Sequence, residues 1–293
     1  MPKPTRRTLG VLALTTALCG GTALSASAIT GGEADGERHP NVGMIFFYDD
    51  EGRFRCTASL ASPTVLLTAA HCTEGTLGKT GVTFSTLIAE QGPSPLPVAA
   101  DPSAGYTQEE LEVAGYASGT AYTHPQYSDF TDMRNWNDVG VIVLDKPIND
   151  IFPVAVAPSG FLDKFTANLL NKAIFTSVGY GTEVRKAVPT ADGPNQGKRP
   201  TAESYPMLRR VADQPGQKLT SQILQLNGNL NDKKGTGGTC FGDSGGPTFK
   251  DGYQVTVTSY GYNDNCRYIG GYQRIDIPVV QEWLAGFGVT PAG

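Results

Sequence analysis

Gly242-Asp243-Ser244-Gly245-Gly246-Pro247 is the stretch from which the fold of this chain of 293 residues can be worked out. A serine hydroxyl is a poor nucleophile unless a neighbouring base takes its proton and hydrogen-bond donors receive the oxyanion that forms. Small residues around Ser244 let a substrate carbonyl approach the backbone, and a glycine at 242 can direct its N–H toward that carbonyl without steric cost. Taken alone, the string also fits a glycine-rich turn.

A second stretch, Thr68-Ala69-Ala70-His71-Cys72, lies far upstream and offers the base that such a serine needs. A histidine base must be held in one tautomer and its imidazolium stabilised, which requires a buried carboxylate. Asp138 fits because it begins the apolar run Val139–Leu144, where an unpaired carboxylate would be costly. Its alternative role, a turn residue before a strand, would apply equally to Asp129 and Asp132.

Together these motifs resemble those of the trypsin/chymotrypsin family of serine proteases, in particular a bacterial secreted member. The resemblance covers nearly the whole chain after residue 28. It rests further on Ile29-Thr30-Gly31-Gly32, Asn137-Asp138-Val139-Gly140 and Ser259-Tyr260-Gly261. It implies an all-β, chymotrypsin-like fold of two antiparallel six-stranded Greek-key barrels with a C-terminal helix. Barrel one is expected over about 29–150 and barrel two over about 151–293.

The resemblance also implies a catalytic role for each motif. His71 acts first as general base and then as acid, Asp138 orients it, and Ser244 attacks the substrate. The N–H groups of Gly242 and Ser244 hold the oxyanion. The match of Asn137-Asp138-Val139 to the family separates Asp138 from the two other aspartates. The chain is therefore expected to be a serine endopeptidase.

In the family, the free amine of the first mature residue inserts and pairs with the carboxylate beside the nucleophile. Ile29 and Asp243 match these two positions. Signal cleavage before Ile29 would then liberate the activating amine directly.

Specificity follows from the same resemblance. It places Gly238 at the base of the primary pocket, where a trypsin-like enzyme carries Asp, and Gly261 and Gly270 on the pocket wall. Because no acid lies there, cleavage after Lys or Arg is disfavoured. A deep uncharged pocket suits Phe, Tyr, Leu or Met, and an elastase-like preference for small residues is the runner-up. Ser259 and Tyr260 complete the expected substrate-binding residues.

The first 28 residues have the pattern of a signal peptide. Lys3, Arg6 and Arg7 precede the apolar run Leu9–Leu18, and the small residues Ala26-Ser27-Ala28 form a cleavage site. The adjacent arginines leave both general and twin-arginine export open. We therefore expect a secreted, extracellular protein.

Removal of this leader leaves 265 residues and, because the leader carries three basic residues and no acidic one, changes the formal net charge from −5 to −8. Such a surface does not attract nucleic acid. No later stretch approaches the ~20 apolar residues of a membrane span. The expected partners are protein or peptide substrates and, by resemblance, protein protease inhibitors, with the chain itself a monomer.

Four cysteines remain after the leader, and four cysteines permit three pairings. An exported chain favours disulfides. Metal binding is the competing reading, but the chain has no C-x-x-C spacing and only three histidines. The family resemblance selects Cys56–Cys72 and Cys240–Cys266. We expect no cofactor and no metal.

The 36 Gly and 20 Pro fit many short strands joined by turns.

Two segments depart from what a minimal protease would contain. Residues 90–119 include Glu109-Glu110-Leu111-Glu112, which could hold a cation such as calcium or form a solvated loop. Residues 183–204 are expected to be an exposed insertion, which the resemblance places beside the active site.

Strands are predicted over Val42–Tyr48, Phe54–Leu60, Val65–Ala69, Val139–Leu144, Ala173–Val178, Val255–Tyr260 and Tyr272–Ile275, and a helix from Pro278 to Gly286.

Two other classes of function compete with the protease. A catalytically silent binding protein on a protease scaffold usually lacks a member of the triad, and all three are present here. An esterase or lipase has a G-x-S-x-G motif, which Gly242–Gly246 formally satisfies. That class requires the order Ser, acid, His, whereas here His71 comes first and Ser244 last.

Overall fold

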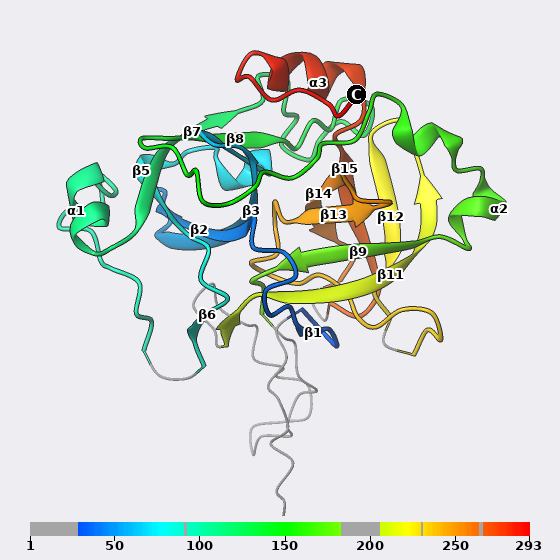
Figure 1. The fold of residues 1–293 in the computed structure, drawn as a ribbon, viewed down its shortest axis with the longest axis horizontal. Helices are drawn as coiled ribbons and strands as arrows, with labels where there is room; N and C mark the ends of the chain where they lie inside the picture. The colour runs from blue at the N-terminus through cyan, green and yellow to red at the C-terminus, as the bar shows by residue number, and fades with distance from the viewer. Residues whose placement is uncertain (1–28, 91–92, 183–205, 230, 264–265) are drawn as a thin grey trace, which may run out of the picture.

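The strands of the computed structural model form two closed barrels that lie next to each other (Figure 1). The structure describes residues 29–90, 93–182, 206–229, 231–263 and 266–293. The predicted leader 1–28 and the predicted insertion 183–204 lie outside these residues. The expected all-β fold of two six-stranded antiparallel barrels with a C-terminal helix is confirmed.

Barrel one forms because its strands present apolar side chains to one interior. All seven residues of the first long strand are buried, and Ile45, Leu60, Leu66 and Ile142 meet in the core. In spatial order the barrel consists of β2 (Val42–Tyr48), β3 (Arg53–Ser62), β4 (Val65–Thr68), β8 (Gly140–Leu144), β7 (Ala117–Thr123) and β5 (Leu77–Thr83).

Barrel two closes because its first strand pairs with neighbours on both of its edges. In spatial order the barrel consists of β9 (Ile174–Gly179), β11 (Arg210–Leu219), β12 (Ile223–Asn227), β15 (Ile269–Arg274), β14 (Tyr253–Gly261) and β13 (Pro247–Lys250), which pairs again with β9. The short β1 (Glu33–Ala34) pairs with β11, and β6 (Leu87–Ala89) pairs with β10 (Met207–Leu208).

The C-terminal helix packs across both barrels. Its side chains Val280 and Leu284 are buried in one cluster with Val65 and Val141 of barrel one and Val257 of barrel two. Proline occupies its first turn, as expected for a helix start. The helices are α1 (Gln108–Val113), α2 (Ala167–Leu170) and α3 (Pro278–Ala285), with the 3-10 turns η1 (Ala70–Cys72) and η2 (Phe161–Lys164).

Part of the segment 90–119 is ordered as a helix, which the sequence analysis did not predict. The Thr107 hydroxyl accepts from the Glu110 N–H, and the Glu110 carboxylate accepts from the Thr107 N–H, which is a capping box. Glu112 pairs with Lys146 at 2.9 Å. Glu110 and Glu112 thus have hydrogen-bond or ion-pair partners within the protein. No described helix has the length and apolar character needed to cross a membrane.

A buried ion pair fastens the N-terminal segment to both barrels. The Arg209 side chain is fully buried, and its Nε donates to Asp35 Oδ2 at 2.8 Å. Asp35 Oδ1 lies 2.6 Å from His39 Nδ1. The Arg209 guanidinium also donates to three backbone carbonyl oxygens, those of Gly36, Val42 and Phe84. Residues from four parts of the chain therefore share one buried cation.

We predict that Asp35→Asn lowers the free energy of unfolding by about 3 kcal/mol, because it leaves Arg209 buried without its counter-charge. Denaturant unfolding measures the loss. The matched control is Glu33→Gln, which removes the exposed pair of Arg38 and Glu33. That change should cost less than about 1 kcal/mol. Equal effects of the two substitutions would contradict the role given to Arg209.

Candidate active site

The turn that carries Ser244 is shaped by glycines and fixed by backbone hydrogen bonds. Gly242 and Gly245 have φ of 92° and 75°, a left-handed conformation that favours glycine. The Ser244 carbonyl accepts from Thr57 N–H at 2.9 Å, and Gly245 N–H donates to Thr258 O at 2.8 Å. The turn is thus held by a strand of each barrel, β3 and β14.

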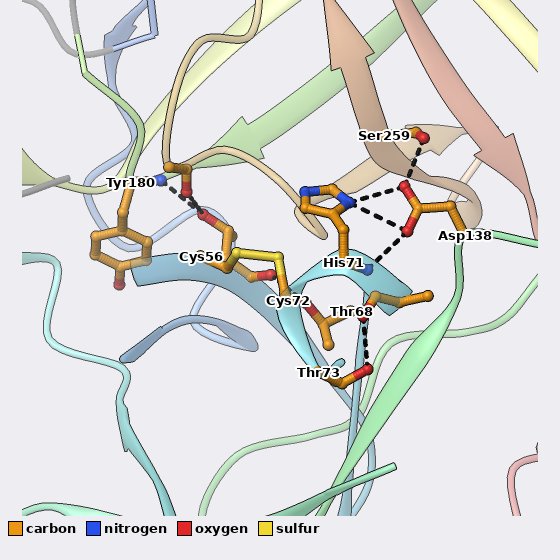
Figure 2. Close-up of a disulfide and its surroundings, with 11 residues drawn as sticks. Cys56, Thr68, His71, Cys72, Thr73, Asp138, Tyr180 and Ser259 are labelled. Atoms are coloured by element: carbon orange, nitrogen blue, oxygen red, sulfur yellow. Dashed lines mark hydrogen bonds and ion pairs between the residues drawn. A yellow bond between two sulfur atoms is a disulfide. The ribbon is translucent and has the colours of Figure 1, made fainter. Parts of the chain in front are cut away.

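His71 and Asp138 are brought together from two strand ends of barrel one. His71 lies in η1, which begins two residues after the end of β4, and Asp138 lies two residues before the start of β8, which pairs with β4. His71 Nδ1 lies 2.9 Å from Asp138 Oδ2, and the backbone N–H of His71 donates to Oδ1 at 3.0 Å. Figure 2 shows the imidazole facing the carboxylate beside the Cys56–Cys72 disulfide. This geometry fixes the imidazole ring and favours the tautomer with its proton on Nδ1.

The Asp138 carboxylate is fully buried and has further partners from barrel two. Ser259 Oγ donates to Asp138 Oδ2 at 2.6 Å (Figure 2). The same oxygen accepts from Trp136 Nε1 at 2.9 Å. Asp138 N–H donates to Gln273 Oε1 at 3.2 Å. Ser259 was predicted only as a substrate-binding residue, and its hydroxyl is engaged with Asp138.

Electrostatics at His71 result from two opposing effects. Burial disfavours the imidazolium, but the charge of Asp138 and its hydrogen bond outweigh burial and raise the pKa of His71 above 6.5. A raised pKa means that the imidazole becomes charged already at mildly acidic pH. Below that pKa it can no longer accept a proton on Nε2.

Ser244 and the His71 turn are neighbours through packing of the adjoining backbone. A Cβ on Gly245 would lie 2.7 Å from Ala69 N, which places the residue after Ser244 against the end of β4. The described hydrogen bonds do not include one between Ser244 Oγ and His71 Nε2. Within the described residues, the N–H groups of Gly242 and Ser244 also have no hydrogen-bond partner. These two N–H groups are therefore free to receive an oxyanion.

Asp243, the residue before Ser244, is fully buried. Its Oδ1 accepts from Gly181 N–H at 2.7 Å and its Oδ2 from Cys240 N–H at 2.8 Å. Burial raises its pKa to about 7, although these two donors and the charges of Arg55 and Arg210 oppose the rise. A carboxyl with such a pKa would be stabilised as an anion by one more cation.

Ile29 is also fully buried, and Thr30 pairs with Gly238. The N-terminal segment therefore reaches barrel two close to the Ser244 turn. No hydrogen bond from the Ile29 nitrogen to Asp243 is among those of the described residues. The pairing expected from the sequence remains a prediction.

A pocket of about 160 Å³ opens beside Ser244. Tyr260, Gly261 and Gly270 are among its lining residues, and their role in binding substrate stays a prediction. Gly238 is not among the described lining residues, and a Cβ there would lie 2.7 Å from the Cα of Gly228. The sequence analysis did not find three polar residues that line the pocket, Gln214, Thr239 and Tyr272.

Both disulfides that the resemblance selected are formed, Cys56–Cys72 and Cys240–Cys266. The first joins β3 to the residue after His71, and both cysteines of the second line the pocket. Among the described residues, one group of potential metal ligands gathers, made of His71 and the two cysteines of the first disulfide. Because that disulfide uses both sulfurs, the group offers no thiolate to a metal.

Comparison with known sequences finds relatives over most of the chain. The model of the family described as Trypsin matches residues 28–284. Brachyurin from Leptuca pugilator is 28% identical over 276 residues, which cover 90% of this chain and 100% of brachyurin. A trypsin from Saccharopolyspora erythraea is 24% identical over 239 residues, which cover 80% of this chain and 86% of that protein.

Solved structures show the same fold at low sequence identity. The structure of HL collagenase has a TM-score of 0.60 and 14% identity, and the match covers 91% of this chain and 100% of that one. An inactivated protease paralogue of the scabies mite has a TM-score of 0.60 and 14% identity, with 90% and 100% covered. At such identities the likeness concerns the fold alone.

We predict that Asp138→Asn lowers the pKa of His71, because the substitution removes the charge that raises it while keeping the side-chain shape. NMR titration of the imidazole C–H signals measures both values. The wild-type pKa should lie above 6.5. The control Asp132→Asn removes an exposed carboxylate and should leave the titration unchanged. A wild-type pKa at or below that of the Asp138→Asn variant would contradict the assignment.

Proposed function

This chain belongs to the trypsin family, and on that basis we propose that it is a secreted serine endopeptidase acting through Ser244, His71 and Asp138. The observation that carries the proposal is the 2.9 Å contact between His71 Nδ1 and the buried Asp138 carboxylate. With Nδ1 bonded to Asp138, the other ring nitrogen, Nε2, is the atom that we propose as the proton acceptor for Ser244. The trypsin and brachyurin relatives support a peptide or protein substrate.

The proposed reaction proceeds in two halves. Ser244 Oγ attacks the scissile carbonyl carbon while its proton passes to His71 Nε2, and the N–H groups of Gly242 and Ser244 receive the oxyanion. His71 then donates the proton to the leaving amine, and the acyl-enzyme forms. A water molecule then attacks the acyl carbonyl carbon and gives a proton to His71. The ester bond to Ser244 breaks, His71 returns the proton to Ser244 Oγ, and the new carboxylate is released.

The pocket beside Ser244 supports cleavage after large apolar residues. Gly261 and Gly270 leave its wall open, and none of its described lining residues carries an acid. Burial of an aromatic ring gains roughly 25 cal/mol per Å² of apolar surface. A Lys or Arg side chain would be desolvated without a counter-charge. Small residues would leave the pocket partly empty, which makes an elastase-like preference the second choice.

A catalytically silent binding protein is the alternative function. The scabies mite structure, described as an inactivated protease paralogue, has this same fold. The fold therefore does not by itself require catalysis. The presence of His71, Asp138 and Ser244 together favours the active enzyme.

We predict that Ser244→Ala lowers peptidase activity by about five to six orders of magnitude while the fold persists. A phosphonylating reagent should modify Ser244 alone in the wild type and nothing in the variant, as read by mass spectrometry. The control Ser103→Ala changes an exposed serine and should keep full activity. Near-wild-type turnover by the Ser244→Ala variant would exclude the triad, and an inactive, unmodified wild type would favour the silent homologue.

We further predict that the secreted protein begins at Ile29 and is active without a second cleavage. The ammonium of Ile29 would add a positive charge beside the buried Asp243 carboxylate, whose pKa burial raises to about 7. N-terminal sequencing identifies the first residue. One extra residue before Ile29 should weaken activity strongly, whereas one residue added after Gly293 should not. An earlier start combined with a latent precursor would contradict this activation.

A further inference from the structure

Three residues that line the pocket beside Ser244 form a hydrogen-bond network that the proposed reaction does not use. Tyr272 OH donates to Gln214 Oε1 at 2.9 Å. The same hydroxyl lies 2.8 Å from Thr239 Oγ1, which can donate to it. Burial raises the pKa of Tyr272 to about 12, so this phenol stays protonated and the network stays neutral.

Gln214 has one polar atom without a partner. Its side chain is fully buried, and its Nε2 has no hydrogen bond within the described part of the chain. An unsatisfied buried amide is unfavourable. Gln214 is also one of the residues that line the pocket beside Ser244.

The local fold directs Gln214 inward. In β11 successive side chains point to opposite faces, and Asp213, the preceding residue, is partly exposed and bonded to Thr176. A Cβ on Gly228 would lie 3.6 Å from Gln214 Nε2. Because glycine has no side chain, nothing from position 228 covers the amide.

In either orientation of the Gln214 amide, one of its two polar atoms has no hydrogen-bond partner among the described residues. A tyrosine hydroxyl can donate to an amide oxygen or accept from an amide nitrogen. Tyr272 therefore satisfies whichever of the two Gln214 atoms faces it. The other atom, a donor or an acceptor, then has no hydrogen-bond partner among the described residues.

We propose that Gln214 is a specificity-determining residue whose amide binds the phenol hydroxyl of a tyrosine preceding the scissile bond. The inference rests on the proposed endopeptidase function and narrows its substrate class. A phenol hydroxyl both donates and accepts, so it pairs with the free atom of Gln214 in either orientation. Its ring fills the part of the pocket next to the glycines of the wall.

Other substrate side chains before the scissile bond would match the hydrogen-bonding groups of the pocket less well than tyrosine. Phenylalanine has the same ring but leaves the Gln214 amide unpaired. A lysine ammonium or a glutamate carboxylate would bring a charge to a network without an opposite charge among the described lining residues. A leucine or methionine side chain lacks a strong hydrogen-bonding group.

The test compares matched peptide substrates that differ only in Tyr, Phe, Ala or Arg before the scissile bond. For the wild type we expect kcat/KM to be about tenfold higher for Tyr than for Phe, since a site built to bind a hydroxyl rejects the analogue without it. Gln214→Leu should reduce the ratio of Tyr to Phe to about one, mainly by loss of activity on Tyr. If that variant does not fold, Gln214→Met removes the amide while keeping the length of the side chain.

The matched control is Gln281→Leu, which removes another buried amide, in α3, outside the pocket. It should leave the ratio of Tyr to Phe unchanged. A wild-type ratio near one, or a ratio that survives Gln214→Leu or Gln214→Met, would overturn the inference while leaving the protease intact. Failure of the wild type to cleave any of the four substrates would instead overturn the proposed function.

Discussion

One residue of barrel one, Thr57, ties the Ser244 turn to the rest of the molecule. Its N–H donates to Ser244 O at 2.9 Å, and its hydroxyl donates to Gly242 O at 2.8 Å. The same hydroxyl accepts from Tyr180 N–H at 3.0 Å. Because Ser244 belongs to barrel two and His71 to barrel one, their alignment depends on such contacts between the barrels. The carbonyl oxygens of Gly242 and Ser244 both accept from Thr57, whereas the N–H groups of these two residues have no partner among the described residues.

Buried charge is handled differently at three places in this fold. Asp35 has a full counter-charge in Arg209 at 2.8 Å. Asp138 is fully buried and is surrounded by donors, with His71 able to become its counter-ion. Asp243 has two backbone donors within hydrogen-bond distance, and burial raises its pKa to about 7. The first arrangement stabilises the fold, whereas the other two leave room for a proton or a cation to be gained during function.

The elements that could be predicted from the sequence are those with a clear local pattern of residues. The apolar run Val42–Tyr48 became β2 with the predicted bounds, and Pro278 opened α3. Strand β11 was missed because Arg210 and Gln214 are polar and buried, and Pro215 interrupts the pattern. These residues are compatible with a strand only because tertiary contacts bury them, which a local pattern does not reveal. Helix α1 was different, since Thr107 and Glu110 already had the spacing of a capping box.

The candidate site shows the same difference between residues in local motifs and residues brought together by tertiary contacts. The residues proposed for chemistry lie in short motifs with fixed spacing, so His71, Asp138 and Ser244 could be named from the sequence. The end of the pocket is assembled from Gln214 in β11, Tyr272 in β15 and Thr239 before the nucleophile turn, and no motif links the three. The hydrogen bonds of the Ser244 turn to Thr57 and Thr258 involve none of them. Substitutions at that end of the pocket can therefore change which side chain is accepted while the triad keeps its geometry.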